Sequence, residues 1–170
     1  MWANDDGPSR RPFIEPHAMT DPWDLKRFVD AQDPVWHVVQ DELWRGAKRS
    51  HWMWFVFPQL AGLGRSATAA RYAISGIGEA EAYLAHPLLR ERLDVATTLM
   101  LDVSGRTATD VLGTPDDMKF RSSMTLFART AADDGLYRQA LSRFFGGAED
   151  GRTAAGLVRG GAPCPSAGLA

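Results

Sequence analysis

The stretch that decides the fold class is PLLRERLDVATTLMLDV, residues 87–103. Its apolar side chains recur at helical spacing and form one wide stripe, which consists of Leu88, Leu89, Leu93, Ala96, Leu99, Met100 and Val103. This stripe predicts a long helix whose apolar face lies in the core. Because no segment shows a convincing period-two alternation bounded by hairpin turns, we predict an all-α protein.

Capping residues divide the rest of the chain into shorter helices. Asp21 and Pro22 open a helix to about residue 32, Ser66 and Asp150 are placed to cap two others, and Thr107 can cap a short turn. Further helices are expected over about 35–45, 78–85, 115–129 and 136–145. Together these segments predict a single compact bundle of about seven to nine helices.

The length of 170 residues fits one domain with two ends that are poor in core-forming side chains. Residues 1–20 are predicted to form a disordered tail, and Met19, directly before the first helix, is a candidate for the true start of translation. Residues 158–170 are rich in Gly, Ala and Pro and predict a second flexible tail. The all-α domain is therefore expected over residues 21–157.

The composition, with 45% hydrophobic and 24% charged residues, is that of an ordinary globular protein. Its 19 basic and 21 acidic residues provide no overall positive field, so no nucleic-acid partner is expected. The one cysteine, Cys164, can close no intramolecular disulfide and build no thiolate zinc site, which favours a cytoplasmic location. No apolar run approaches the roughly 20 residues that span a bilayer, so no membrane association is expected.

A dense motif, Lys48-Arg49-Ser50-His51, precedes the apolar run of residues 52–57. The run suits a buried strand or a buried helix, and we predict a helix because a lone strand would leave backbone groups unpaired. Ser50 would be its N-cap and Pro58 would end it. The two cations would then lie at a helix N-terminus, where the dipole favours an anion. The motif therefore indicates an anion-binding pocket.

Other side chains would complete this pocket. The ring of Trp52 or Trp54 would stack on the ligand, and Arg65, which follows a glycine-containing turn, would help Lys48 and Arg49 to hold its charge. Further polar side chains would orient it, namely Gln32, Ser50, Gln59, Arg92, Lys119 and Ser122. Structural alternatives exist: Gln32 can cap a backbone group, Arg92 and Lys119 can extend their charges to water, and Ser122 can bond to the carbonyl one turn earlier.

Catalysis would fall to His51 as acid or base, in a hydrolase or transferase that acts on a nucleotide-type or ribose-phosphate substrate. The sequence contains no His-Glu-x-x-His motif, no spaced Cys/His set and no Asp-rich loop, so no metal site is expected.

Several motifs between residues 23 and 157 carry a resemblance to a known family. They are residues 48–60, Gly62-Leu63-Gly64, Arg27-Phe28, Ala31-Gln32, Glu79-Ala80, Ala82-Tyr83-Leu84, His86-Pro87, Arg92-Leu93, residues 116–119 and residues 122–127. With these motifs the chain resembles a bacterial family catalogued as domain of unknown function 1810. The resemblance implies a compact all-α fold and a bacterial cytoplasmic protein, and no established activity, cofactor or catalytic residue. Some members carry the label calpastatin, but this chain lacks the repeats of that disordered inhibitor.

These observations favour a pocket that binds a phosphorylated or otherwise anionic metabolite, with no cofactor expected. One alternative is an interaction domain or homodimer that uses an aromatic surface. A third interpretation is structural, with the buried side chains of the motif satisfying one another's hydrogen bonds.

Overall fold

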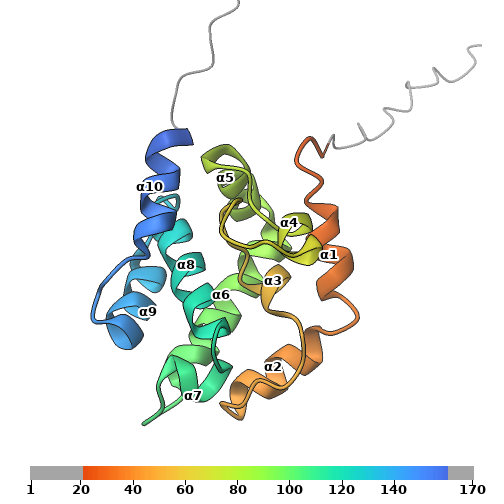
Figure 1. The fold of residues 1–170 in the computed structure, drawn as a ribbon. Coiled ribbons are helices and arrows are strands. Elements are labelled where there is room, and N and C mark those ends of the chain that lie inside the picture. The colour runs from red at the N-terminus through yellow and green to blue at the C-terminus, as the bar shows by residue number, and fades with distance from the viewer. Residues whose placement is uncertain (1–20, 161–170) are drawn as a thin grey trace, which may run out of the picture.

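The computed structural model of the protein describes residues 21–160, which form helices joined by short loops (Figure 1). Within this range ten helices occur, against the seven to nine expected. They are α1 (Lys26–Gln32), α2 (Trp36–Trp44), α3 (Met53–Val56), α4 (Ala67–Arg71), α5 (Ile77–Ala85), α6 (Pro87–Asp102), α7 (Ala108–Leu112), α8 (Asp116–Ala128), α9 (Gly135–Phe145) and α10 (Gly151–Gly160). The all-α prediction is confirmed.

The ends of the chain bear on the predicted domain limits. Helix α10 runs to Gly160, so residues 158–160 are helical although they were assigned to a flexible tail. The remaining predicted tails, residues 1–20 and 161–170, lie outside the described residues. None of the helices within residues 21–160 combines the length and the apolar character that crossing a bilayer requires.

Side-chain capping explains where several of these helices begin. Ser66 Oγ accepts a hydrogen bond from the Ala69 N–H at 3.0 Å, and Thr107 forms a capping box with Asp110. Asp150 Oδ2 accepts from the Thr153 N–H at 2.8 Å. These three predicted caps are confirmed, because a cap depends only on side chains within one helical turn.

The first helix begins later than predicted. Asp21 does accept two backbone hydrogen bonds, but they come from Leu25 and Lys26, at 2.8 and 2.9 Å. The chain turns between them, with Asp24 at a positive φ of 50°. Helix α1 therefore starts at Lys26 rather than at Pro22.

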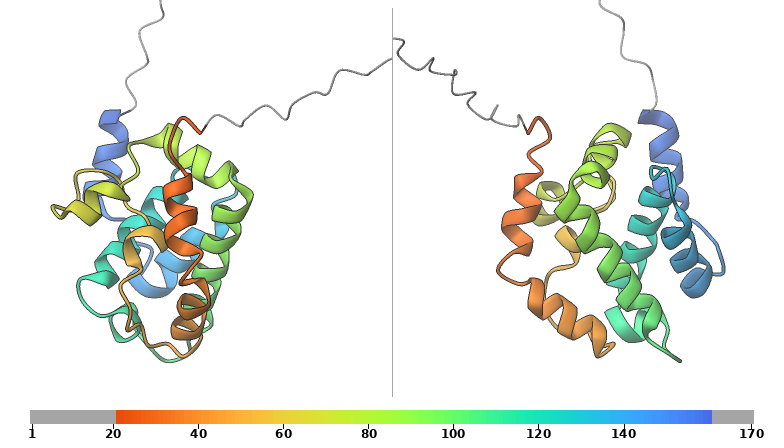
Figure 2. Two further views of the ribbon diagram at one scale, coloured as in Figure 1. Left: turned by 90° about the vertical axis from the view of Figure 1, so that its right-hand side faces the viewer. Right: turned by 180° about the vertical axis from the view of Figure 1, so that it is seen from behind.

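Helices α6 and α8 form the centre of the bundle. Helix α6 contacts α1, α2, α3, α5 and α9, and α8 contacts α7, α9 and α10. Seen from behind in Figure 2, α6 runs between α1 and α2 on one side and α8, α9 and α10 on the other. The predicted stripe of the long helix is buried at Leu89, Leu93, Ala96 and Met100.

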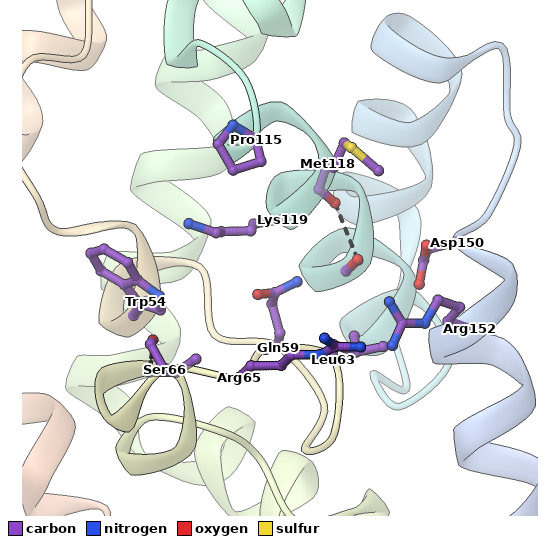
Figure 3. Close-up of a pocket in the computed structure, with 13 residues that line it drawn as sticks. Trp54, Gln59, Leu63, Arg65, Ser66, Pro115, Met118, Lys119, Asp150 and Arg152 are labelled. Carbon is purple, nitrogen blue, oxygen red and sulfur yellow. Dashed lines mark hydrogen bonds between the residues drawn. The ribbon is translucent and has the colours of Figure 1, made fainter.

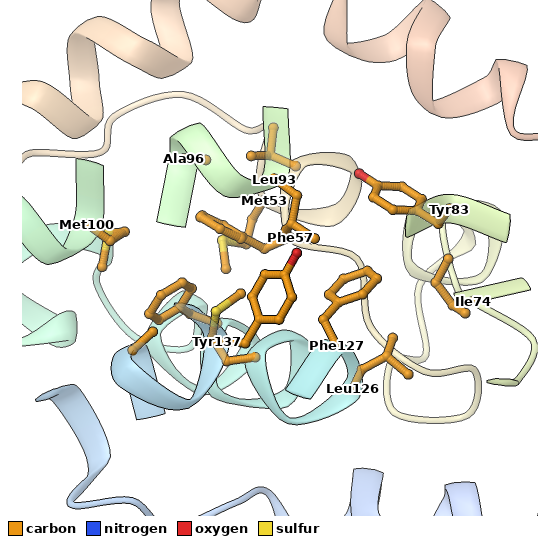
Figure 4. Packing of buried hydrophobic residues seen from close by; sticks show 14 of the residues in the cluster. Met53, Phe57, Ile74, Tyr83, Leu93, Ala96, Met100, Leu126, Phe127 and Tyr137 are labelled. Carbon is orange, nitrogen blue, oxygen red and sulfur yellow. The ribbon is translucent and has the colours of Figure 1, made fainter. Parts of the chain in front are cut away.

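Aromatic rings fill the space between these helices (Figure 4). Phe57 meets Phe120 edge to face with centroids 4.8 Å apart, and Tyr83 packs against Phe127 at 5.3 Å. Such pairs add about 0.5 to 1.5 kcal/mol each to the burial of their area. The core therefore fixes α8 and the segment after α3 relative to each other.

The aromatic run of residues 52–57 forms a helix, as predicted, but a shorter one. Helix α3 covers Met53–Val56, and its N-cap is Trp52. The prediction that Ser50 caps this helix is wrong, because the Ser50 hydroxyl donates instead to Glu42 Oε1 at 2.5 Å.

Candidate functional site

The carboxylate of Glu42 is the anion that the Lys48–Trp52 motif binds. Glu42 Oε2 accepts hydrogen bonds from the Arg49 N–H at 2.9 Å, the Ser50 N–H at 3.1 Å and the Trp52 indole N–H at 2.8 Å. With the Ser50 hydroxyl, four donors surround a side chain that is 8% exposed. We call residues 48–52 the Glu42 loop. This arrangement agrees with the structural interpretation of the motif, since its polar groups are largely used inside the protein.

Burial opposes the charge on Glu42, but hydrogen bonds from the Ser50 hydroxyl, the two backbone N–H groups and the Trp52 indole outweigh it. They lower the pKa of Glu42 from 4.5 to about 2. A carboxyl whose pKa is depressed by folding stabilises the protein above its unfolded pKa and loses that contribution as pH falls toward the folded pKa.

We therefore expect acid to weaken the wild type more than a Glu42→Gln variant. Between pH 7 and pH 3 the wild type should lose about 2 kcal/mol more of its free energy of unfolding than the variant does. Urea denaturation at both pH values measures this difference. If the free energy of unfolding falls by the same amount in both proteins, folding does not lower the pKa of Glu42.

A separate cavity of about 380 Å³ lies between the loop that precedes α4, the first turns of α8 and the start of α10 (Figure 3). We call it the Trp54 pocket. It brings together five of the predicted ligand-binding residues, Trp54, Gln59, Arg65, Lys119 and Ser122. It also contains Leu63, Gly64, Ser66, Ala69, Pro115, Met118, Asp150 and Arg152.

Lys119, which lines the pocket, shares a carboxylate with Lys48, and the residue that supplies this carboxylate, Asp116, lies behind the lining. Asp116 Oδ1 accepts from Lys119 Nζ and Asp116 Oδ2 from Lys48 Nζ, both at 2.7 Å. Burial alone would raise the pKa of Asp116, but hydrogen bonds from the Lys119 and Lys48 ammonium groups hold that pKa below its ordinary value. Two cations and one anion leave a net charge of +1 on this group. Lys48 is 7% exposed and lies behind it, whereas Lys119 lines the pocket.

Trp54 and Lys119 are held together by a cation–π contact, with the ammonium 4.4 Å from the ring centroid. This face of the ring is therefore occupied while Lys119 stays bonded to Asp116. Trp54 is half-buried, and its indole N–H has no hydrogen bond to another residue in the described range. A ligand can therefore contact the edge of the Trp54 ring and accept a hydrogen bond from its indole N–H, but it cannot stack on the face that Lys119 covers.

The opposite side of the pocket carries two arginines. Arg65 is exposed, and its guanidinium makes no hydrogen bond or ion pair within residues 21–160. Arg152 reaches only the Gly62 carbonyl, at 3.5 Å. Near them, Asp150 uses Oδ2 to accept from both the N–H and the hydroxyl of Thr153. The amide of Gln59 lies between this side and Lys119 in Figure 3, and it has no side-chain hydrogen bond to a described residue.

Two predicted ligand-binding residues do not line the Trp54 pocket: Gln32 lies on α1 and Arg92 on α6. Gln32 is fully buried and its side-chain amide donates to the Phe55 carbonyl at 2.7 Å. It therefore satisfies a backbone group, which is the structural role considered for it in the sequence. Arg92 pairs with Asp33 at 2.8 Å and lies 5.3 Å from the ring of Trp36. Both therefore leave the candidate site.

The motif residues also lie outside the pocket. Lys48, Ser50 and Trp52 are bound within the protein as described, and Trp52 is only 1% exposed, which leaves no ring face for a ligand. His51 is exposed and does not line the pocket. Arg49 lies in a different hollow of about 590 Å³, the Arg49 groove, with His37, Val38, Asp41, Glu42, Arg45, Ala47 and Arg106. The single pocket predicted around residues 48–66 is thus divided between two places.

Ser122 follows its structural alternative, and one lining residue, Arg152, is new. Ser122 reaches the wall of the pocket, but the hydroxyl is used on the Met118 carbonyl one turn earlier, at 3.1 Å. Arg152 was not predicted, although a cation in the first turn of a helix is electrostatically unfavourable and signals a negative partner. Among the described residues, no group of three or more His, Cys, Asp or Glu side chains is placed to hold a metal ion.

Comparison with family models identifies the class of protein that this bundle and its motifs define. Residues 22–157 match the model described as protein of unknown function (DUF1810), and the chain belongs to this family. The match spans α1 to α9 and most of α10, including the Glu42 loop and the residues of the Trp54 pocket.

The chain is similar to a conserved hypothetical protein, Rv1873, from Mycobacterium tuberculosis, which is known from a crystal structure. The two share 54% sequence identity, and the similarity covers 81% of this chain and 99% of that one, with a TM-score of 0.80. The comparison with curated proteins finds no match.

Proposed function

We propose that the Trp54 pocket binds a small phosphorylated or otherwise anionic metabolite. The observation that carries the proposal is an excess of open hydrogen-bond donors in one cavity: the Arg65 and Arg152 guanidinium groups and the Trp54 N–H. Guanidinium groups match phosphate and carboxylate oxygens in pairs, which makes an oxyanion their natural partner. The volume of about 380 Å³ suits a compact ligand.

The residues assigned to the ligand change accordingly. Arg65, Arg152 and Lys119 hold its charge, and Gln59 and Trp54 donate further hydrogen bonds. Leu63, Met118 and Pro115 supply apolar contact. Lys48 acts indirectly, since it holds the Asp116 carboxylate to which Lys119 is bonded.

The other functional hypotheses receive less support. A hydrolase or transferase with His51 as acid or base requires that residue in the pocket, and it does not line it. An aromatic docking surface requires exposed rings in the motif, but Trp52 and Phe57 are buried. Among the described aromatic residues, Trp44 on α2 is 75% exposed and is the best candidate for such a contact.

A thermal-shift screen of the full chain against inorganic phosphate, sugar phosphates and nucleotides tests the proposal. A ligand at 100 times its dissociation constant adds about 2.7 kcal/mol if it binds only the folded state. The double variant Arg65→Ala/Arg152→Ala should keep the wild-type melting temperature without ligand, because both side chains are exposed. It should weaken the binding of the best ligand about 100-fold, since each lost charge-assisted hydrogen bond is worth about one decade.

The matched control is Arg45→Ala/Arg49→Ala, which removes the same charge from the Arg49 groove. This variant should bind like the wild type. If it loses binding while Arg65→Ala/Arg152→Ala retains it, the ligand site is the Arg49 groove and the proposal fails.

A further inference from the structure

We infer that the ligand of the Trp54 pocket is doubly anionic, with two phosphate or carboxylate groups at opposite ends of a short polar body. This inference rests on the proposed function and specifies its substrate class. The pocket has cationic groups on two sides rather than one. Figure 3 shows Lys119 on one side of the Gln59 amide and Arg65 and Arg152 on the other.

Each side has the same net charge. On the first, Lys119 and Lys48 share one carboxylate, Asp116, so two positive charges and one negative charge leave +1. On the second, Arg65 and Arg152 lie with Asp150, which again leaves +1. A ligand with one charged end would neutralise one side only, and the net charge of +1 on the other side would have no counter-charge from the ligand.

Lys119 is held in a position that suits this role. Its ammonium is fixed between the Trp54 ring and the Asp116 carboxylate, at 4.4 Å and 2.7 Å, and it is 21% exposed. An ammonium has three N–H donors, so one bonded to a single carboxylate oxygen retains donors for a ligand. Because its position is already fixed, little side-chain entropy is lost when an anion binds.

Polar groups also lie in the middle of the pocket, where they can bind the part of the ligand that joins its two anionic groups. The Gln59 amide can both donate and accept, and it has no side-chain partner among the described residues. Asp150 keeps one carboxylate oxygen, Oδ1, without a hydrogen bond in the described range, and it can accept from a hydroxyl group. A hydroxylated chain or sugar ring between the two anionic groups satisfies both residues.

The experiment is calorimetric titration of the full chain with a matched pair of probes, fructose 1,6-bisphosphate and fructose 6-phosphate, at low ionic strength. The bisphosphate should bind at least about tenfold more tightly than the monophosphate, because its second phosphate gains a charge-assisted contact. A single phosphate should occupy the arginines, since Lys119 already has a carboxylate partner.

The variant Lys119→Met should weaken the binding of the bisphosphate by more than it weakens that of the monophosphate, so that the two affinities become similar. Asp116 keeps Lys48 as a partner in this variant, so the fold is expected to survive. Arg65→Ala/Arg152→Ala should weaken both probes. Equal affinity of the two probes for the wild type overturns the doubly anionic ligand and leaves the anion pocket standing, whereas no binding of either probe overturns both.

Discussion

Replacing Glu42 by alanine is expected to lower the free energy of unfolding by about 3 to 5 kcal/mol, the cost of breaking a buried charged network from one side. The carboxylate is the shared acceptor of two backbone N–H groups, a hydroxyl and an indole N–H. Without it, four donors from the Glu42 loop lose their partner in a buried site. Each buried unsatisfied donor costs about 1 to 3 kcal/mol, partly relieved by water entry.

Urea denaturation of Glu42→Ala against Asp41→Ala measures this effect. Asp41 is the neighbouring acid, exposed and paired with Arg45 one turn away, so its loss should change stability by less than about 0.5 kcal/mol. Similar midpoints for both variants would mean that the Lys48–Trp52 motif does not depend on an internal anion. The motif would then again be available for an external one.

Replacing Glu79 by alanine is expected to lower the free energy of unfolding by about 3 to 5 kcal/mol, because it leaves the largely buried Arg27 guanidinium without its counter-charge. Arg27 Nη2 lies 2.5 Å from Glu79 Oε1, and the two side chains are only 12% and 4% exposed. Arg27 also donates to the carbonyls of Arg71 and Ala73, at 2.9 and 3.0 Å. The pair therefore fixes α1 against the start of α5 and the segment that precedes it.

The control for Glu79→Ala is Asp30→Ala, which breaks the exposed Lys26–Asp30 pair on α1. Exposed pairs at this spacing contribute little to stability, so Asp30→Ala should leave the free energy of unfolding nearly unchanged. Thermal and urea unfolding of the two variants should separate them clearly. Equal losses would show that the Arg27–Glu79 pair is no more than a surface contact.

The Glu42 network and the Arg27–Glu79 pair give a structural role to several sequence motifs that do not line the Trp54 pocket. Arg27-Phe28, Glu79-Ala80 and Ala31-Gln32 supply a buried ion pair and a buried amide. Residues 48–52 supply the donors around Glu42. These motifs are part of the framework, which is a different role from contact with a ligand.

Capping made much of the fold predictable. The Ser66, Thr107 and Asp150 caps depend on neighbours within one turn, so residue type and spacing suffice. The start of α3 was not predictable in this way. Ser50 has the right residue type for a cap, but Glu42, on another helix, takes its hydroxyl. A partner from a different element is not encoded in the local pattern.

The site was predictable only in part for the same reason. Trp54, Gln59, Arg65, Lys119 and Ser122 were chosen from the sequence and lie together in one cavity. Their grouping with Arg49 and Trp52 rested on proximity along the chain, whereas α3 turns Trp52 inward and Trp54 toward the pocket. Arg152 comes from α10, close to Gly62 in space but far from it in sequence.

The most direct test of the anion pocket is a nitrogen-detected NMR titration of the full chain with fructose 1,6-bisphosphate. The indole N–H of Trp54, the side-chain amide of Gln59 and the Nε–H groups of Arg65 and Arg152 should shift together and saturate. The indole signals of Trp44 and Trp52 should stay in place, because one lies outside the pocket and the other is bonded to Glu42. Saturable shifts confined to Arg45 and Arg49, or none at any of these groups, would contradict the assignment of the site.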